Sequence, residues 1–165
     1  MGIRIKSTSD KFTLRDLSEF LYHLDNIYKA EVFLLQNIEY EKSDFYKIKL
    51  KDSESLFVGP ISKKSPFDII LVPTITIGGM AGIIFGIIQI IINLKNSKNE
   101  KNNYKKSEKS KITITIRHEI ERKQIPHNDI VLDEIKEVID SKIDINDVTV
   151  EDRTYRDYFG EDIPK

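Results

Sequence analysis

The spacing of apolar and polar residues predicts one long helix between short strands in the N-terminal part of the chain. Residues 3–6 alternate isoleucine with a basic residue, which is typical of a strand with one buried face. From about residue 13 to residue 36, leucines recur at steps of three and four, as on one face of an amphipathic helix that Thr13 would cap. Further strands are expected at residues 46–51 and 56–58, and residues 67–72 are expected to be either a fourth strand or the first part of the apolar run. Residues 1–72 are therefore predicted to form a small α+β unit.

A second, shorter alternation follows in the C-terminal part. Over residues 112–120 every second side chain is isoleucine, except for His118, so a strand with one apolar face is expected. Asn128 or Asp129 would then cap a helix with an apolar face. The acidic residues 144–165 are expected to be partly ordered at most. Residues 112–165 are thus predicted to be a strand–helix unit with an acidic tail, and the whole chain to be of the α+β class.

The middle of the chain is far more apolar than either end. Residues 69–94 carry no charge and hold 11 of the 28 isoleucines, although the mean hydropathy of the chain is only −0.36. Because Pro73 disfavours helix before it, a continuous helix is expected over residues 73–94. About 20 apolar residues are enough to cross a bilayer, so this helix is predicted to be membrane-associated. The alternative is a helix buried inside a soluble fold or oligomer.

Three glycines follow one another at steps of four within this apolar segment. On a helix, Gly78, Gly82 and Gly86 would form a flat stripe that lets a second helix approach closely. Each glycine costs helix stability, by about 0.5–1 kcal/mol relative to alanine, so three on one face suggest a purpose. The sequence therefore predicts helix association through these residues, and a homo-oligomer.

Charge is unevenly distributed around the apolar segment. The net charge of the chain is −1, yet residues 95–111 contain seven lysines and two acids, whereas residues 112–165 contain 14 acids and 8 bases. Residues 95–111 are expected to be a solvated linker or a helix extension. Their lysines could contact anionic lipid headgroups; the candidates are Lys95, Lys98, Lys105 and Lys106. The balanced total gives no reason to expect nucleic-acid binding.

The segments that flank the apolar helix give conflicting predictions of its orientation in a membrane. The excess of lysine after the helix would place residues 95–165 in the cytosol and residues 1–66 outside. Residues 1–66 carry 21 charges, and residues 1–11 have no apolar stretch of a signal peptide. Two alternatives avoid the conflict. The helix lies in the membrane interface, or it is shielded in an oligomer until a trigger releases it.

Candidate chemistry is sparse. The chain has no cysteine, and its three histidines, His23, His118 and His127, lack the close spacing of metal ligands. Each histidine is expected to be an ordinary core or surface residue. No phosphate-binding loop, paired-carboxylate motif or nucleophile elbow is present. The chain is therefore expected to be non-enzymatic, with no catalytic residue, metal or cofactor.

Two stretches resemble a group of small bacterial proteins. They are Leu14-Arg15-Asp16-Leu17, which opens a helix continuing to Leu24 and Tyr28, and residues 65–71, which lead into the Gly- and Ile-rich segment. Together, residues 3–95 are similar to the membrane-associated domains of bacterial conflict and phage-defence systems described as TRADD-N-associated. The resemblance implies a module that associates with itself, a membrane or a protein partner, as an effector or adaptor at the bacterial cell membrane. A cytoplasmic interaction module is the alternative.

Overall fold

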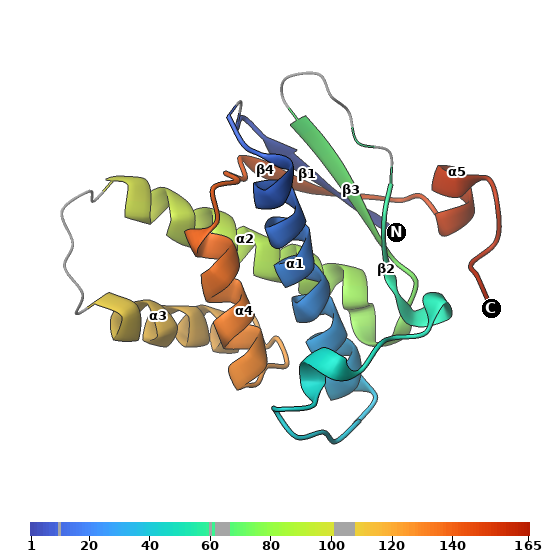
Figure 1. Cartoon of the computed structure of the whole chain (residues 1–165), viewed down its shortest axis with the longest axis horizontal. Coiled ribbons are helices and arrows are strands. Elements are labelled where there is room, and N and C mark those ends of the chain that lie inside the picture. Colours follow the sequence, from blue (N-terminus) through green and yellow to red (C-terminus); the bar gives the residue numbers. More distant parts are fainter. Residues whose placement is uncertain (10, 60, 62–66, 101–107) are drawn as a thin grey trace.

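A computed structural model describes residues 1–9, 11–59, 61, 67–100 and 108–165, and within them the α+β class is confirmed. Four antiparallel strands form one sheet in the order β2-β3-β1-β4. The strands are β1 (Gly2–Ser7), β2 (Leu56–Val58), β3 (Phe67–Pro73) and β4 (Asp147–Glu151). The α-helices are α1 (Leu14–Leu35), α2 (Met80–Glu100), α3 (Glu108–Arg122), α4 (Asp129–Asp140) and α5 (Tyr155–Phe159). Helices α1 to α4 lie to one side of the sheet, as Figure 1 shows.

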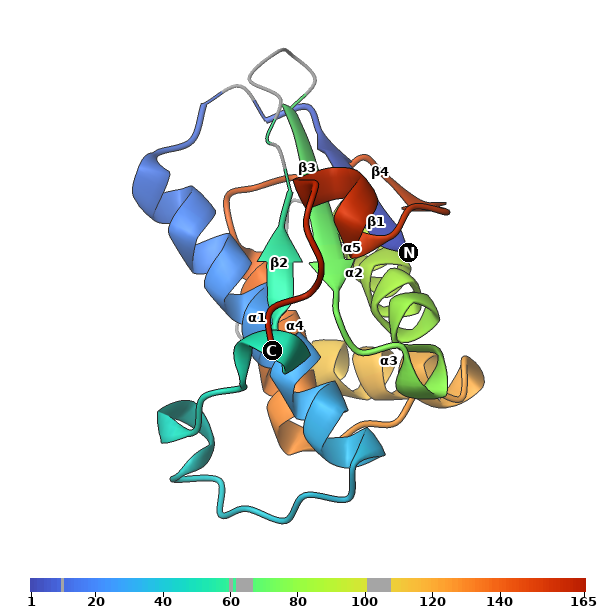
Figure 2. The ribbon, with the colours of Figure 1, turned by 90° about the vertical axis from the view of Figure 1, so that its right-hand side faces the viewer.

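The two faces of the sheet have different environments because side chains alternate along each strand. Ile3 and Ile5 of β1 point into the main core, where their partners across the ladder include Leu71, Ile69 and Val148. Helices α1, α2, α3 and α4 contribute the rest of that core. On the opposite face, α5 packs over the sheet as a separate, smaller aromatic cluster (Figure 2). The protein therefore has one large core and one small one.

Several elements predicted from the pattern are confirmed. Strands β1, β2 and β3 and helix α1 fall where expected. Thr13 caps α1 in a reciprocal arrangement: its hydroxyl accepts from the Asp16 amide, and the Asp16 carboxylate accepts from the Thr13 amide at 2.8 Å. Asn128 caps α4 in the simpler way, by accepting from the Val131 amide at 3.1 Å.

The strand predicted over residues 46–51 is wrong. This segment contains the short 3-10 helices η1 (Phe45–Lys47) and η2 (Asp52–Glu54), joined by irregular backbone. Ile48 and Leu50 pack against the core without a neighbouring strand, because β2 takes the sheet edge beside β3. The alternation arises because Ile48 and Leu50 are half-buried while the lysines beside them are exposed, and this arrangement does not require a strand.

The strand predicted over residues 112–120 is also wrong, because these residues belong to α3. On a helix, Ile116 and Ile120 share one face, and both are fully buried. Ile114 points the other way and is 67% exposed, and His118 is exposed as well rather than on an apolar face. Tertiary packing on α4 and α2 overrides the strand-like pattern here.

The acidic tail is more ordered than expected. Residues 147–151 form β4, an edge strand that pairs with β1. After a short connection, Thr154 caps α5 in a reciprocal arrangement with Asp157. Segments from both ends of the chain thus build the same sheet, and residues from 1–72, 73–94 and 112–165 share one core.

Candidate functional site: the apolar helix and the buried polar groups around it

The apolar helix begins later than its sequence predicts. β3 extends to Pro73, and α2 starts only at Met80. The connection contains Gly78 and Gly79, whose φ angles of 68° and 72° lie in the left-handed region that glycine tolerates best. Two successive left-handed residues interrupt any helix, so the chain turns sharply before α2 begins.

One face of α2 forms the centre of the main core. Ile84, Ile87, Ile88, Ile90 and Ile91 are at most 2% exposed. The stretch Met80–Ser97 is long and apolar enough to cross a membrane, and 44% of it is buried inside the protein. The core helix of a soluble protein meets the same criterion, so length and composition support either environment.

The three glycines predicted to form one stripe have three different surroundings. Gly78 lies before α2, in the short 3-10 helix η3 (Ile77–Gly79), and an added Cβ would meet the Leu35 side chain at 3.0 Å. Gly86 is buried, and its added Cβ would meet Ile125 at 3.1 Å. At Gly82 an added Cβ meets nothing within 4 Å. The expectation of one continuous glycine stripe is therefore corrected: in this fold only Gly82 offers an open helix surface.

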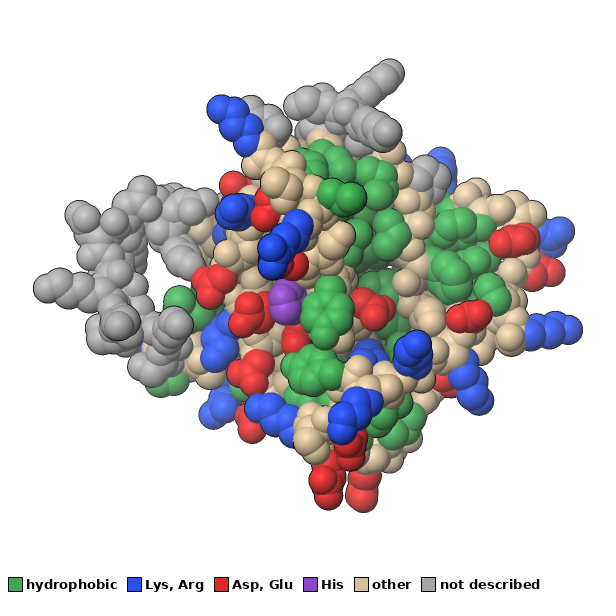
Figure 3. Space-filling model, viewed as in Figure 1, with side chains coloured by type: hydrophobic (Ala, Val, Ile, Leu, Met, Phe, Trp, Pro, Cys, Tyr) green, Lys and Arg blue, Asp and Glu red, His purple; other side chains and the backbone are tan. Residues whose placement is uncertain are grey.

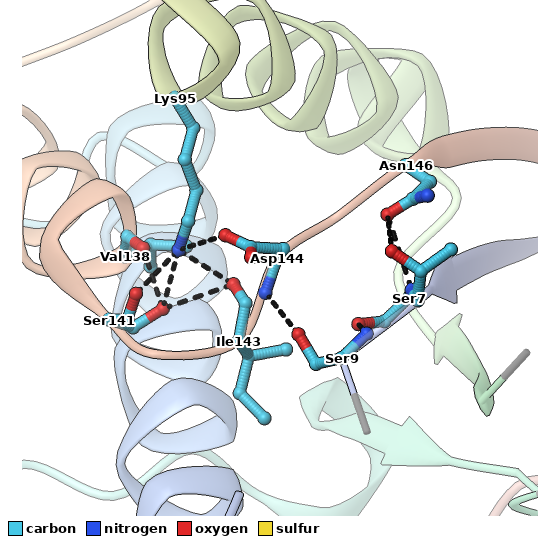
Figure 4. A network of polar contacts seen from close by, with 9 residues as sticks. Ser7, Ser9, Lys95, Val138, Ser141, Ile143, Asp144 and Asn146 are labelled. Atoms are coloured by element: carbon cyan, nitrogen blue, oxygen red, sulfur yellow. Dashed lines mark hydrogen bonds and ion pairs between the residues drawn. The ribbon is translucent and has the colours of Figure 1, made fainter. Parts of the chain in front are cut away.

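Lys95, a predicted headgroup contact, is turned inward (Figure 4). Its Nζ donates to the Ser141 carbonyl at 2.6 Å and to the Ile143 carbonyl at 2.7 Å, and lies 3.6 Å from the Asp144 carboxylate. These oxygens follow the C-terminal end of α4, where unpaired carbonyls and the helix dipole favour a cation. In this fold Lys95 stabilises α4 and is not placed to meet lipid. The side chain of Lys98, and Lys105 and Lys106 altogether, lie outside the described part of the structure.

A buried carboxylate that the sequence reasoning missed joins α1, α4 and η1. Glu134 of α4 accepts hydrogen bonds from Tyr46 Oη at 2.7 Å and from Asn26 at 3.4 Å. His23 Nδ1 lies 2.6 Å from Oε2 of Glu134, the oxygen that also accepts from Asn26. Burial, followed by the bond to Glu134, raises the pKa of Tyr46. The available signal was an acid within the apolar face of the predicted C-terminal helix. Glu134 follows Val131 by three positions, directly precedes Ile135 and precedes Val138 by four.

A second buried carboxylate has no such support. Glu31 of α1 is 0% exposed, and neither of its carboxylate oxygens accepts a hydrogen bond from any described residue. Burial raises its pKa to about 8. The sequence signal was again an acid in the apolar part of a helix, surrounded by Ala30, Val32 and Phe33, and the sequence reasoning missed it as well.

The chemistry available elsewhere in the described residues is limited. No group of three metal-ligating side chains gathers there. Two of the histidines have nearby partners of other kinds. His23 contacts Glu134, and His127 Nδ1 lies 3.2 Å from the Ile125 carbonyl. An open hollow of about 510 Å³ lies between the end of α1 and the start of α4, lined by Leu34, Tyr40, Asn128 and Ile130 among others. Asn128 there already donates to the Tyr40 hydroxyl at 2.7 Å.

No family model, curated protein or solved structure matches this chain. The geometry of α2 and its surroundings therefore provides the observations that bear on function.

Proposed function

We propose that the protein is a non-enzymatic interaction module that keeps its apolar helix inside its own fold and associates with a second copy. The observation that supports this most strongly is the complete burial of five isoleucines on one face of α2. If α2 crossed a bilayer as a single helix, those side chains would have to leave the core and face lipid. Lipid would take up the isoleucines themselves, but the core residues they cover would become exposed to water, at about 1.5–3 kcal/mol for each large apolar side chain.

The open side of α2 supports the self-association part of the proposal. Gly82, Asn93 and Asn96 are exposed, while Gln89 is half-buried. These four residues are uncharged, although Lys123 donates to Gln89 at 3.3 Å, and Gly82 leaves room for another backbone. A copy of the same helix, packed against the exposed part of this surface around Gly82, would cover it without opening the core.

The first experiment is fractionation of the full chain without detergent, followed by mass measurement in solution. We expect the protein in the supernatant as a discrete oligomer. Recovery only from membranes, in detergent, would contradict the proposal. A monomer of constant mass across the concentration range would contradict self-association.

A pair of glycine variants separates association from folding. Gly82→Ile is expected to lower the oligomer mass while leaving the thermal midpoint within a few degrees, because nothing lies within 4 Å of the added Cβ. Gly86→Ile is the matched control: it collides with Ile125 and should lower the thermal midpoint. If Gly82→Ile leaves the oligomer unchanged, the contact lies elsewhere.

A membrane role is the second candidate, favoured by the length and apolar character of Met80–Ser97. It requires a state in which α2 has left the core, and its location would be the bacterial cell membrane. A role as an effector or adaptor in bacterial defence rests on the resemblance of residues 3–95 alone. Flotation of the full chain with vesicles of anionic lipid tests the membrane candidate, and absence of lipid-bound protein contradicts it.

A further inference from the structure

The buried carboxylate of Glu31 sits on the side of α1 that faces the start of α2. Tyr28 and Leu35 lie one turn before and one turn after it, on the same side of the helix. The Tyr28 hydroxyl accepts from the Ile75 amide at 3.4 Å, and the Leu35 side chain lies against Gly78. Glu31 is therefore packed at the seam between α1 and the segment that leads into α2.

Among the described residues, no charged group on the α2 side of this seam can compensate an ionised Glu31. Residues 69–94 carry no charge, and Lys95 is engaged at the far end of α2 with Ser141 and Ile143. The hydroxyl of Tyr28 accepts from the Ile75 amide and does not donate to Glu31.

The charged groups on the other side of α1 are also engaged. Lys29 donates to the Ile48 carbonyl at 3.1 Å, and Glu134 of α4 is held by His23, Asn26 and Tyr46. A negative charge on Glu31 would thus be buried with neither a counterion nor a hydrogen bond among the described residues. An isolated buried charge is strongly unfavourable, whereas the neutral acid is tolerated.

We propose that Glu31 is a proton-controlled lock between α1 and α2: the neutral acid keeps the seam closed and dry, and loss of the proton opens it. Opening hydrates the carboxylate and separates the start of α2 from α1. The lock does not depend on oligomerisation, so its test can succeed or fail independently of the proposed function. Because the pKa in the closed seam is raised from 4.5 to about 8, the lock responds between about pH 4.5 and pH 8.

The chain has no cysteine, so a single introduced thiol can report on the seam. Met80→Cys places a thiol at the first, fully buried residue of α2. Ala30→Cys is the matched control: this residue is also fully buried, but it lies one turn from Asn26, on the side of α1 that meets Glu134 of α4. Each thiol is labelled with a soluble maleimide from pH 5 to pH 9 in the full chain, with and without Glu31→Gln.

The measured quantity is the labelling rate with Glu31 divided by the rate with Glu31→Gln, which removes the pH dependence of the thiol itself. For the thiol at position 80 we expect this ratio to rise about tenfold per pH unit up to about pH 8 and then level off. For the thiol at position 30 it should stay flat. A flat ratio at position 80, or an equal rise at both positions, overturns the proposal. Glu31→Leu replaces Glu31→Gln if the glutamine variant does not fold.

Discussion

Three buried polar side chains in this protein differ in the partners available to them. Glu134 has three partners and Lys95 has several oxygen partners, whereas Glu31 has none among the described residues. A buried polar group that is paired contributes modestly to stability, but one left unpaired costs its full desolvation. Substitutions at Lys95 and at Glu31 should therefore act in opposite directions.

Lys95→Met is expected to destabilise the protein by about 1–3 kcal/mol, because it removes the donor to the Ser141 carbonyl and leaves the Ile143 carbonyl with only the Ser141 hydroxyl, at 3.5 Å. The control is Lys47→Met, which removes only an exposed pair with Asp44 and should change the free energy of unfolding by less than about 0.5 kcal/mol. Urea unfolding followed by circular dichroism measures both. Equal effects from the two variants would show that the inward contacts of Lys95 carry no stability.

Glu31 gives the fold a pH dependence of known sign. Its pKa in the folded protein, about 8, lies above the ordinary value of 4.5, so the folded state retains a proton that the unfolded state loses. The stability of the natural chain relative to Glu31→Gln should be greatest below pH 4.5. It should fall by about 1.4 kcal/mol per pH unit up to about pH 8 and then stay level. Urea unfolding across this range measures it, and a constant difference would mean that Glu31 is solvated.

At the scale of the elements, α3 shows how a strand-like pattern can belong to a helix. As a strand, residues 112–120 would place Ile114 and Ile120 on the same buried face. As a helix, they separate: Ile114 is 67% exposed and Ile120 is 0% exposed. Ile120→Ala should therefore cost about 2–4 kcal/mol, and Ile114→Ala less than about 0.5 kcal/mol, in urea unfolding. Similar costs at both positions would support the strand.

Elements whose pattern is decided locally could be predicted from the sequence, and those decided by distant neighbours could not. The capping arrangement of Thr13 and the leucine spacing define α1 within one stretch of chain. β4 is a strand because β1, more than 140 residues earlier, offers it an edge. The different surroundings of Gly78, Gly82 and Gly86 likewise depend on Leu35 and Ile125, which no spacing in the glycine segment reveals.

At the scale of the whole molecule, the sheet separates two cores of unequal size. The helical side holds most of the buried apolar residues, whereas the other side depends on the C-terminal segment. Charged and hydrophobic side chains are mixed over the face shown in Figure 3. On the outer side of the sheet, Arg4 pairs with Asp68 and Glu151, and Tyr158 of α5 donates to Glu151 at 2.8 Å. The end of the chain is thereby tied to its beginning.

The aromatic residues of α5 are expected to close the outer face of the sheet. Tyr155 and Phe159 pack on Phe57, with ring centroids 5.0 and 5.9 Å away, and the same cluster covers Ile70 and Val72. Replacing Tyr155 and Phe159 with alanine should expose this apolar surface and increase the binding of a hydrophobic dye. Because α5 has only five residues, helical circular dichroism should change little. Arg156→Ala, on the exposed side of α5, is the control and should leave dye binding unchanged. An unchanged dye signal in the double variant would mean that α5 is not needed to cover the sheet.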